Sequence, residues 1–145
     1  MRNTVRLSVA PLLSLACAAA LQAQSPPQIA HERVSVAATN DEWTPTTTTV
    51  AEGDLLLVEA EGRITVGRVV GQVGADGHSS GAGRLMLKIG TGAGQRVGAH
   101  AFIRAGEAGQ VKLRVNDNRY ADNDGTFTVS VIHIPAGLIP PAKIE

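Results

Sequence analysis

Apolar and polar residues alternate along several short stretches of the chain, and segments rich in glycine or proline separate these stretches. The alternation is clearest in residues 33–38 (RVSVAA), 110–115 (QVKLRV) and 126–134 (TFTVSVIHI). A period of two is typical of a half-buried β-strand. It predicts that Val111, Leu113 and Val115 point inward, and likewise Phe127, Val129 and Val131.

Other stretches complete an all-β pattern. Strands are predicted in the threonine-rich segment before residue 51, in residues 55–60, 63–70 and 84–90, and once or twice within residues 91–109. Residues 71–83 hold five glycines without periodicity and are predicted to form a long loop. No helical periodicity follows the first 23 residues. About eight short strands separated by turns predict a two-sheet antiparallel β-sandwich.

The first residues have the layout of a secretory signal peptide. A start with two arginines precedes the apolar run LSVAPLLSLACAAAL, and small residues follow it. The run is shorter than the roughly 20 residues that a membrane-spanning helix needs. Cleavage is predicted after Ala23, with Ala20 as the alternative. We therefore expect a signal peptide at 1–23, a mobile leader at 24–32, a β-sandwich domain at 33–134 and a C-terminal tail at 135–145, with no integral membrane segment after cleavage.

Composition excludes several classes of function. Loss of residues 1–23 removes Arg2, Arg6 and Cys17 and leaves 11 Lys+Arg against 13 Asp+Glu, a net charge of about −2. This balance gives no electrostatic basis for binding nucleic acid. Without cysteine, the mature chain has neither disulfides nor thiolate chemistry.

The stretch VNDNRYADNDG, residues 115–125, concentrates three aspartates and three asparagines between two predicted strands. Such a loop can offer several oxygens to calcium, which takes six to eight of them. Asn, Asp and Gly also dominate plain turns for backbone reasons, so a turn without metal is the alternative. An EF-hand is excluded, because its spacing would place Tyr120 at position 1 and Val131 at position 12.

Three stretches resemble the PA-I-like galactophilic lectin family of bacteria and its wider secreted relatives. EWTPTTTTVAEGDLLLVEAEGRITVG is similar to the family's Trp-Thr…Val-x-x-Gly-Asp…Ala-x-Gly opening, and GADG begins a similar glycine-rich loop. The most specific stretch, KLRVNDNRYADNDGTFTVSV, resembles the family's Asn-Asp…Asp/Asn-Asn-x-Gly-x-Phe-x-Val ending. The likeness spans about residues 33–132.

The resemblance implies a jelly-roll or galactose-binding-domain-like sandwich that holds one Ca²⁺ at a loop end. Carried over by position, the ligands are the side chains of Asp117, Asp122 and Asn123 and the backbone carbonyls of Val66 and Arg119. In these lectins the ion accepts two hydroxyls of a terminal galactose. This chain departs from the pattern in two ways: the loop is about two residues shorter, and Asp122 stands where the lectins have Asn.

His78 and Tyr120 are the predicted additional ligand contacts. His78 is a loose counterpart of the family's sugar-contacting histidine, and Tyr120 is the obvious aromatic residue in a loop. Trp43 is predicted to pack at the core or an edge, with ligand stacking as the alternative. A Ser–His pair at His78 has neither a nucleophile elbow nor a partner acid, so no catalytic residue is predicted.

The sequence therefore predicts a secreted or periplasmic bacterial module that binds galactose-like sugars through Ca²⁺ and is not an enzyme. The expected partner is a galactoside or another glycan, and homo-oligomers are possible. The alternative is a non-enzymatic envelope domain for structure or protein interaction, in which any calcium only stabilises the loop.

Overall fold

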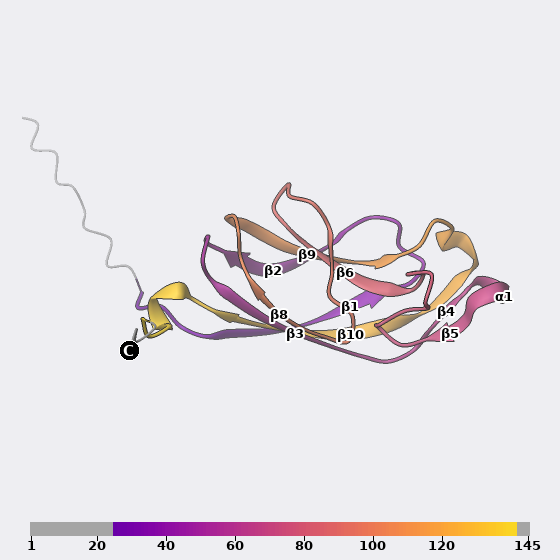
Figure 1. Ribbon diagram of the computed structural model, residues 1–145, viewed down its shortest axis with the longest axis horizontal. Coiled ribbons are helices and arrows are strands. Elements are labelled where there is room, and N and C mark those ends of the chain that lie inside the picture. The colour runs from indigo at the N-terminus through magenta and orange to yellow at the C-terminus, as the bar shows by residue number, and fades with distance from the viewer. Residues whose placement is uncertain (1–24, 142–145) are drawn as a thin grey trace, which may run out of the picture.

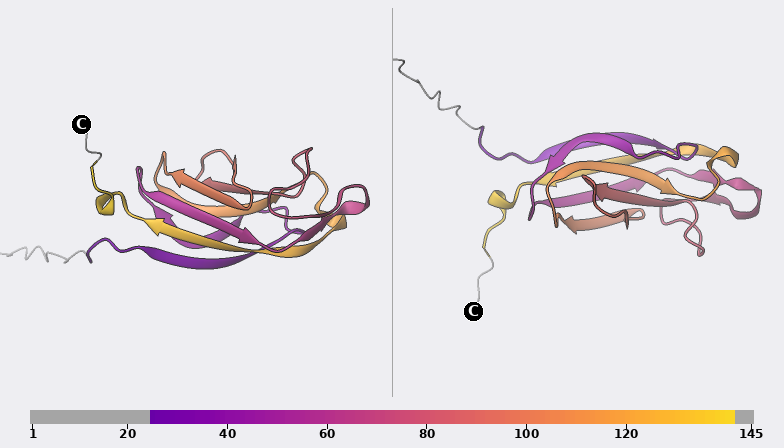
Figure 2. Two further views of the ribbon diagram at one scale, coloured as in Figure 1. Left: turned by 60° about the horizontal axis from the view of Figure 1, so that its bottom comes forward. Right: turned by 90° about the horizontal axis from the view of Figure 1, so that it is seen from above.

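Two antiparallel β-sheets packed face to face make up residues 25–141, the part of the chain that the computed structural model describes (Figures 1 and 2). The strands are β1 (Ala30–Ala37), β2 (Thr44–Val50), β3 (Leu55–Glu61), β4 (Ile64–Val66), β5 (Gly71–Val73), β6 (Arg84–Ile89), β7 (Gln95–Arg96), β8 (His100–Arg104), β9 (Gly109–Asn116) and β10 (Asn123–Ile134). One α-helical turn, α1 (Gly67–Val70), and two 3₁₀ turns (Tyr120–Asp122 and Ala136–Leu138) complete the described elements. The predicted two-sheet antiparallel β-sandwich is confirmed.

The longest strand, β10, organises the six-stranded sheet. β1 pairs with one side of it over Thr126 to His133. On the other side, β3 pairs with its C-terminal part and β4 with its first three residues. β5 extends the sheet beyond β4, and β8 extends it beyond β3. The second sheet has the order β2–β9–β6–β7.

The core lies between the sheets and follows the alternation in the sequence. The side chains of the two predicted inward sets, Val111, Leu113 and Val115 on β9 and Phe127, Val129 and Val131 on β10, are all fully buried. Leu85 and Leu87 of β6, which lie beside Val115 and Leu113 of β9 in the same sheet, are equally buried. Burying one such side chain stabilises the fold by roughly 1.5–3 kcal/mol relative to leaving it in water.

Several predicted boundaries are wrong. β1 begins at Ala30, so Ala30–Glu32 belong to a strand and not to a leader that ends at residue 32. Residues 63–70 are not one strand, because Gly67 has a φ of +54°, outside the β region, and the chain turns into α1 there. The predicted loop at 71–83 begins with the short strand β5. β10 begins at Asn123, three residues before the alternation at Thr126 becomes clear.

The open edge of β2 is closed by a side chain from β1. The register of β2 on β9 shifts between Pro45 and Thr49, which leaves two backbone amides turned away from the ladder. The Thr47 amide donates to both carboxylate oxygens of Glu32 at 2.8 and 3.0 Å, and the Thr48 amide and hydroxyl donate to Oε2 at 3.1 and 2.8 Å. Glu32 thereby joins the two sheets along one side.

Both ends of the described chain lie at one end of the sandwich, and α1 lies at the other (Figures 1 and 2). Within residues 25–141 we find no helix with the length and apolar character to cross a membrane.

Candidate functional site

A cleft of about 350 Å³ lies at the α1 end of the sandwich, where the loop between β9 and β10 meets α1 and the glycine-rich loop. Three segments far apart in the sequence form its walls. Its lining residues are Val66, Gly67, Arg68, Val69, Val70, Ser80, Ala82, Asp117, Asn118, Arg119 and Asp122. Four of the five residues predicted to hold calcium are among them: Val66, Asp117, Arg119 and Asp122.

The loop between β9 and β10 positions its two lining carboxylates by local contacts. Asp117 directly follows β9, and its Oδ1 accepts the Asn118 amide at 2.8 Å. The 3₁₀ turn Tyr120–Asp122 then brings Asp122 back toward the start of α1. There the Asp122 carboxylate lies against Gly67: a Cβ at Gly67 would be 3.0 Å from Oδ2 and 3.3 Å from Cγ.

Asn123, the fifth predicted ligand, lies directly beside the cleft and is 6% exposed. Its Nδ2 donates to the Ala38 carbonyl at 3.0 Å. Because a carbonyl can only accept, this bond fixes which side-chain atom is nitrogen and which is oxygen. Oδ1 is buried and has no hydrogen-bond partner among residues 25–141. A buried acceptor left unpaired costs about 1–3 kcal/mol, so its environment calls for a donor or a cation.

The backbone places Val66 beside Asn123. The two residues are directly opposite in the antiparallel β4–β10 ladder, and Val66 also lines the cleft. Two carboxylates, one amide oxygen and the carbonyls of Val66 and Arg119 form a donor set of oxygens alone, which suits a hard cation such as calcium. The residues present therefore fit this ion on two grounds: the unpaired Oδ1 of Asn123 and the hard character of the donor set.

The charges of the cleft are balanced within the protein. Arg68 and Arg119 line it together with Asp117 and Asp122, and Arg119 Nε lies 3.6 Å from Asp122 Oδ2. Both partners of this ion pair are well exposed, so water screens it strongly. In the described part of the chain no three His, Cys, Asp or Glu residues come together, so a calcium ion here would depend on amide and backbone carbonyl oxygens for most of its protein ligands. A cation bound here thus meets two carboxylates and two nearby guanidinium groups, which favours weak binding.

His78 and Tyr120, the predicted ligand contacts, are not among the residues that line the cleft. His78 is exposed on the glycine-rich loop, where its Nδ1 lies 3.0 Å from Ser80 Oγ. The Tyr120 hydroxyl donates to the Val115 carbonyl at 2.9 Å and accepts the Asp117 amide at 3.3 Å. Tyr120 therefore braces its own loop, and the nearest link from His78 to the cleft runs through Ser80.

The sequence analysis did not identify two residues that shape the site. Gly67 provides the space for the Asp122 carboxylate, and a glycine interrupting an apolar run was the available signal. Asn116 joins the two loops: its Nδ2 donates to the Gly81 carbonyl at 2.9 Å, and its own carbonyl accepts the Gly83 amide at 2.8 Å. No local pattern indicates this second contact, because its partners are more than 30 residues apart.

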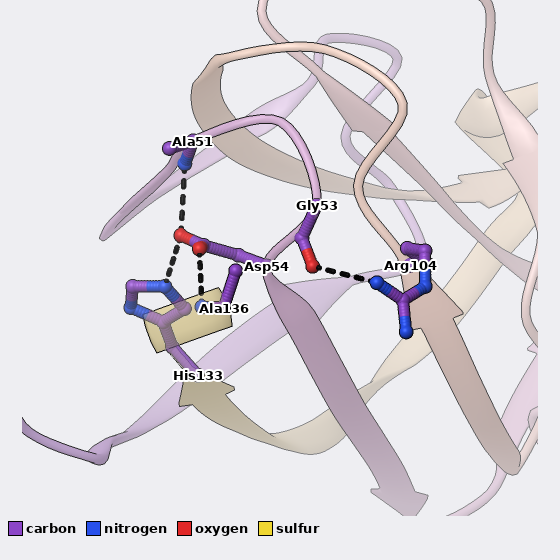
Figure 3. A network of polar contacts seen from close by, with 6 residues as sticks. All are labelled: Ala51, Gly53, Asp54, Arg104, His133 and Ala136. Atoms are coloured by element: carbon purple, nitrogen blue, oxygen red, sulfur yellow. Dashed lines mark hydrogen bonds and ion pairs between the residues drawn. The ribbon is translucent and has the colours of Figure 1, made fainter. Parts of the chain in front are cut away.

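A second buried polar cluster lies at the other end of the sandwich (Figure 3). The Asp54 carboxylate, 6% exposed, accepts the Ala51 and Ala136 amides at 2.9 and 2.8 Å and lies 2.7 Å from His133 Nε2. Burial alone would raise the pKa of Asp54, but these hydrogen bonds and the attraction of His133 outweigh it and lower the pKa. The carboxylate is fully used in fastening the C-terminal turn, so we assign this cluster a structural role.

Comparison with known proteins identifies a structural neighbour. No family model matches the chain. No curated protein matches it either. A solved structure described as "EclA N-terminal domain; PllA-like lectin" matches with a TM-score of 0.61 and 23% sequence identity, over 70% of this chain and 94% of that one.

The chain shares the fold of this lectin domain. At this identity the likeness concerns the fold, and membership of the PA-I-like lectin family stays a prediction.

Proposed function

We propose that the protein is a carbohydrate-binding, lectin-like module in which the cleft at the α1 end holds a calcium ion and the ion receives a galactose-like sugar. The observation that carries the proposal is the buried Oδ1 of Asn123, which has no hydrogen-bond partner among the described residues. Asn123 directly follows Asp122 and pairs with Val66, and both of these residues line the cleft. The neighbour of the same fold, described as a PllA-like lectin, supports it.

Each protein group has a part in this proposal. Asp117 and Asp122 supply negative charge, and Asn123 Oδ1 and the Val66 and Arg119 carbonyls supply neutral oxygens. These five donors leave roughly one to three of calcium's six to eight positions for other ligands. Calcium, when bound, would supply a centre at which adjacent sugar hydroxyls replace water. Arg68 and Asn118, also in the cleft, are placed to donate hydrogen bonds to further sugar oxygens.

The predicted signal peptide, which lies outside the described residues, agrees with this function. We propose export to the periplasm or the cell exterior. A site with two carboxylates is expected to bind calcium with a Kd near ~10⁻⁴–10⁻³ M, as extracellular modules do. Such an affinity is sufficient outside the cytosol.

Thermal unfolding with calcium and with EDTA tests the metal. At calcium about ten times above Kd, we expect the Tm of the unmodified protein to rise by roughly 3–5 °C. Asp117→Ala removes a carboxylate from the cleft and is expected to abolish this rise. Asp124→Ala is the matched control, because Asp124 is exposed, close in sequence and absent from the cleft lining, and it is expected to keep the rise. Equal responses in both variants would contradict the site.

A glycan array with calcium and with EDTA tests the sugar. The proposal expects calcium-dependent binding to galactosides, lost in Asp117→Ala and kept in Asp124→Ala. If calcium raises the Tm and no glycan binds, the second candidate gains: an envelope interaction domain in which the ion only fixes the loop. One observation favours this second candidate. Arg119 forms an ion pair with Asp122, so the conformation of the loop is stabilised by the protein itself and does not depend on a sugar.

A further inference from the structure

The two sheets carry opposite charge. The four strands β2, β6, β7 and β9 contain five cationic residues and no acidic one: Arg84, Lys88, Arg96, Lys112 and Arg114. The strands of the six-stranded sheet contain four acids, Glu32, Glu59, Glu61 and Asp124, against Arg33 and Arg104. A chain with equal numbers of basic and acidic residues thus has one strongly basic sheet.

The cations of this sheet share its outer face. On β6, Leu85, Leu87 and Ile89 are buried, so Arg84 and Lys88 point away from the core. On β9 the buried set likewise turns Lys112 and Arg114 outward. Cross-strand pairing then places Lys88 opposite Lys112, and Met86 opposite both Arg114 and Arg96. We call the outer surface formed by Arg84, Lys88, Arg96, Lys112 and Arg114 the basic face.

This arrangement is unfavourable for the folded protein alone. Like charges directly opposite on neighbouring strands destabilise a sheet. None of the five cations forms an ion pair within residues 25–141, where the ion pairs present are Arg119–Asp122 and Asp54–His133. A local rule broken without a compensating carboxylate is expected at functional sites.

Part of the basic face is held rigid by aromatic rings. Lys88 Nζ lies 4.8 Å and Arg114 Cζ 4.7 Å from the centroid of the Trp43 ring. Arg114 also lies 6.0 Å from the Tyr120 ring, and its Nη1 donates to the Asp41 carbonyl at 3.1 Å. Trp43 reaches across to Gly94, where a Cβ would be 2.8 Å from the ring. Ring contacts fix these cations while leaving their charge uncompensated by any carboxylate.

We propose that the basic face binds an acidic polysaccharide, a chain of sugars that bears carboxylate groups. The cations lie on strands about 4.8 Å apart and recur along each strand every two to four residues, roughly 7–13 Å. They therefore present a flat grid to a linear polyanion. Arginine is suited to paired hydrogen bonds with carboxylates, and the Trp43 ring, the Met86 side chain and the lysine stems offer apolar contact to sugar rings.

The charge distribution favours this occupant over nucleic acid. A flexible polysaccharide can contact one face while it avoids the acidic sheet. A nucleic acid duplex is stiff and densely charged, and its field also acts on the acidic sheet. The inference does not depend on calcium or on the cleft, because none of the five cations lines it.

Binding to sodium polygalacturonate, measured by calorimetry in EDTA, tests the proposal, since EDTA removes any contribution of calcium. In about 20 mM NaCl we expect binding that weakens at least tenfold in about 300 mM NaCl, where charges are screened over a much shorter range. Lys88→Gln combined with Lys112→Gln is expected to weaken binding at least tenfold. Its Tm is expected to equal or exceed that of the unmodified protein, because the substitution removes a repulsive pair.

The matched control combines Arg33→Gln with Arg63→Gln, which changes the net charge equally, with Arg33 on the opposite sheet and Arg63 just before β4. It is expected to keep binding within twofold. The proposal is overturned if the unmodified protein does not bind polygalacturonate at low salt, or if both double variants lose binding equally. It is also overturned if neutral dextran binds as tightly as polygalacturonate. Tighter binding of duplex DNA than of polygalacturonate would assign the face to a different partner.

Discussion

At the scale of single residues, the candidate site depends on the absence of a side chain at Gly67 as much as on the carboxylate of Asp122. Gly67 has a φ of +54°, and the Asp122 carboxylate fills the space where its side chain would begin. A residue with a Cβ would meet two penalties there, one from the left-handed backbone and one from the carboxylate.

Gly67→Ala separates these two penalties when it is compared with Gly71→Ala. Gly71 also has a positive φ, +74°, but a Cβ there meets nothing within 4 Å. We expect both variants to lose about 1–3 kcal/mol of unfolding free energy, measured in urea. Only Gly67→Ala is expected to reduce the Tm rise with calcium, because it displaces Asp122. Loss of the calcium response in both variants would indicate a general effect of the strained backbone.

The sequence could indicate the donors of the site but not their arrangement. The concentration of Asp and Asn in residues 115–125 indicated the loop, and the resemblance to the lectin family implied Asp117, Asp122 and Asn123 within it. The contact between Asn123 and Val66 depends on the register of two strands more than 50 residues apart, and a single sequence carries no local signal for register. Similarly, the inward turn of the Tyr120 hydroxyl depends on the conformation of its loop, which composition leaves open.

At the scale of elements, the edge of β2 shows how a side chain can take the place of a strand. The register shift in β2 leaves the amides of Thr47 and Thr48 without ladder partners, and the Glu32 carboxylate accepts both. Burial alone would raise the pKa of Glu32, but the hydrogen bonds from Thr47 and Thr48 outweigh it and lower the pKa.

Glu32→Gln is expected to lower the unfolding free energy by about 1–2 kcal/mol at neutral pH, because a neutral amide accepts these bonds less strongly. The folded-state pKa lies below the unfolded value of about 4.3, so the stabilisation is present above that value and is lost as the pH falls through the folded-state pKa. The difference between the two proteins in urea denaturation is therefore expected to shrink at acidic pH.

Glu59→Gln is the control for this prediction, since Glu59 is exposed on a central strand of the same sheet. It is expected to leave stability within about 0.5 kcal/mol at all pH values. A pH-independent loss in Glu32→Gln would instead indicate a packing effect.

Strand identity was largely predictable, whereas strand ends were not. Alternation reports which residues face the core, and it identified the inward positions of β9 and β10 correctly. Alternation does not locate the end of a strand where backbone pairing continues through residues that are exposed to solvent. The first residues of β1, Ala30 and His31, are exposed, yet they pair with His133 and Ile132 of β10. Their pairing is a tertiary effect that apolar patterning does not record.

At the scale of the whole molecule, the separation of charge between the sheets gives the protein an electric dipole across the sandwich. Glu59 and Glu61 lie on the outer face of the six-stranded sheet, and the basic face lies on the other side of the sandwich. Two copies can therefore attract each other head to tail, a contact that does not close on itself.

We expect the protein to self-associate weakly at low ionic strength and to return to monomers near physiological salt, where the Debye length is about 8 Å. Light scattering over a series of NaCl concentrations measures this. Lys88→Gln combined with Lys112→Gln is expected to reduce the association. Association that grows with salt would point instead to apolar contact through Phe102, which is 66% exposed on β8.

One strand joins the two ends of the molecule. β10 begins with Asn123 at the cleft and runs to His133, which meets Asp54 beside the C-terminal turn. Both ends of the described chain lie there, opposite the cleft (Figure 1). If the proposed glycan binds in the cleft, a pull between it and either end of the described chain would run lengthwise along β10. Its ladders to β1 and β3 would be loaded in shear, with many hydrogen bonds sharing the force, so the architecture suits a tether under mechanical tension.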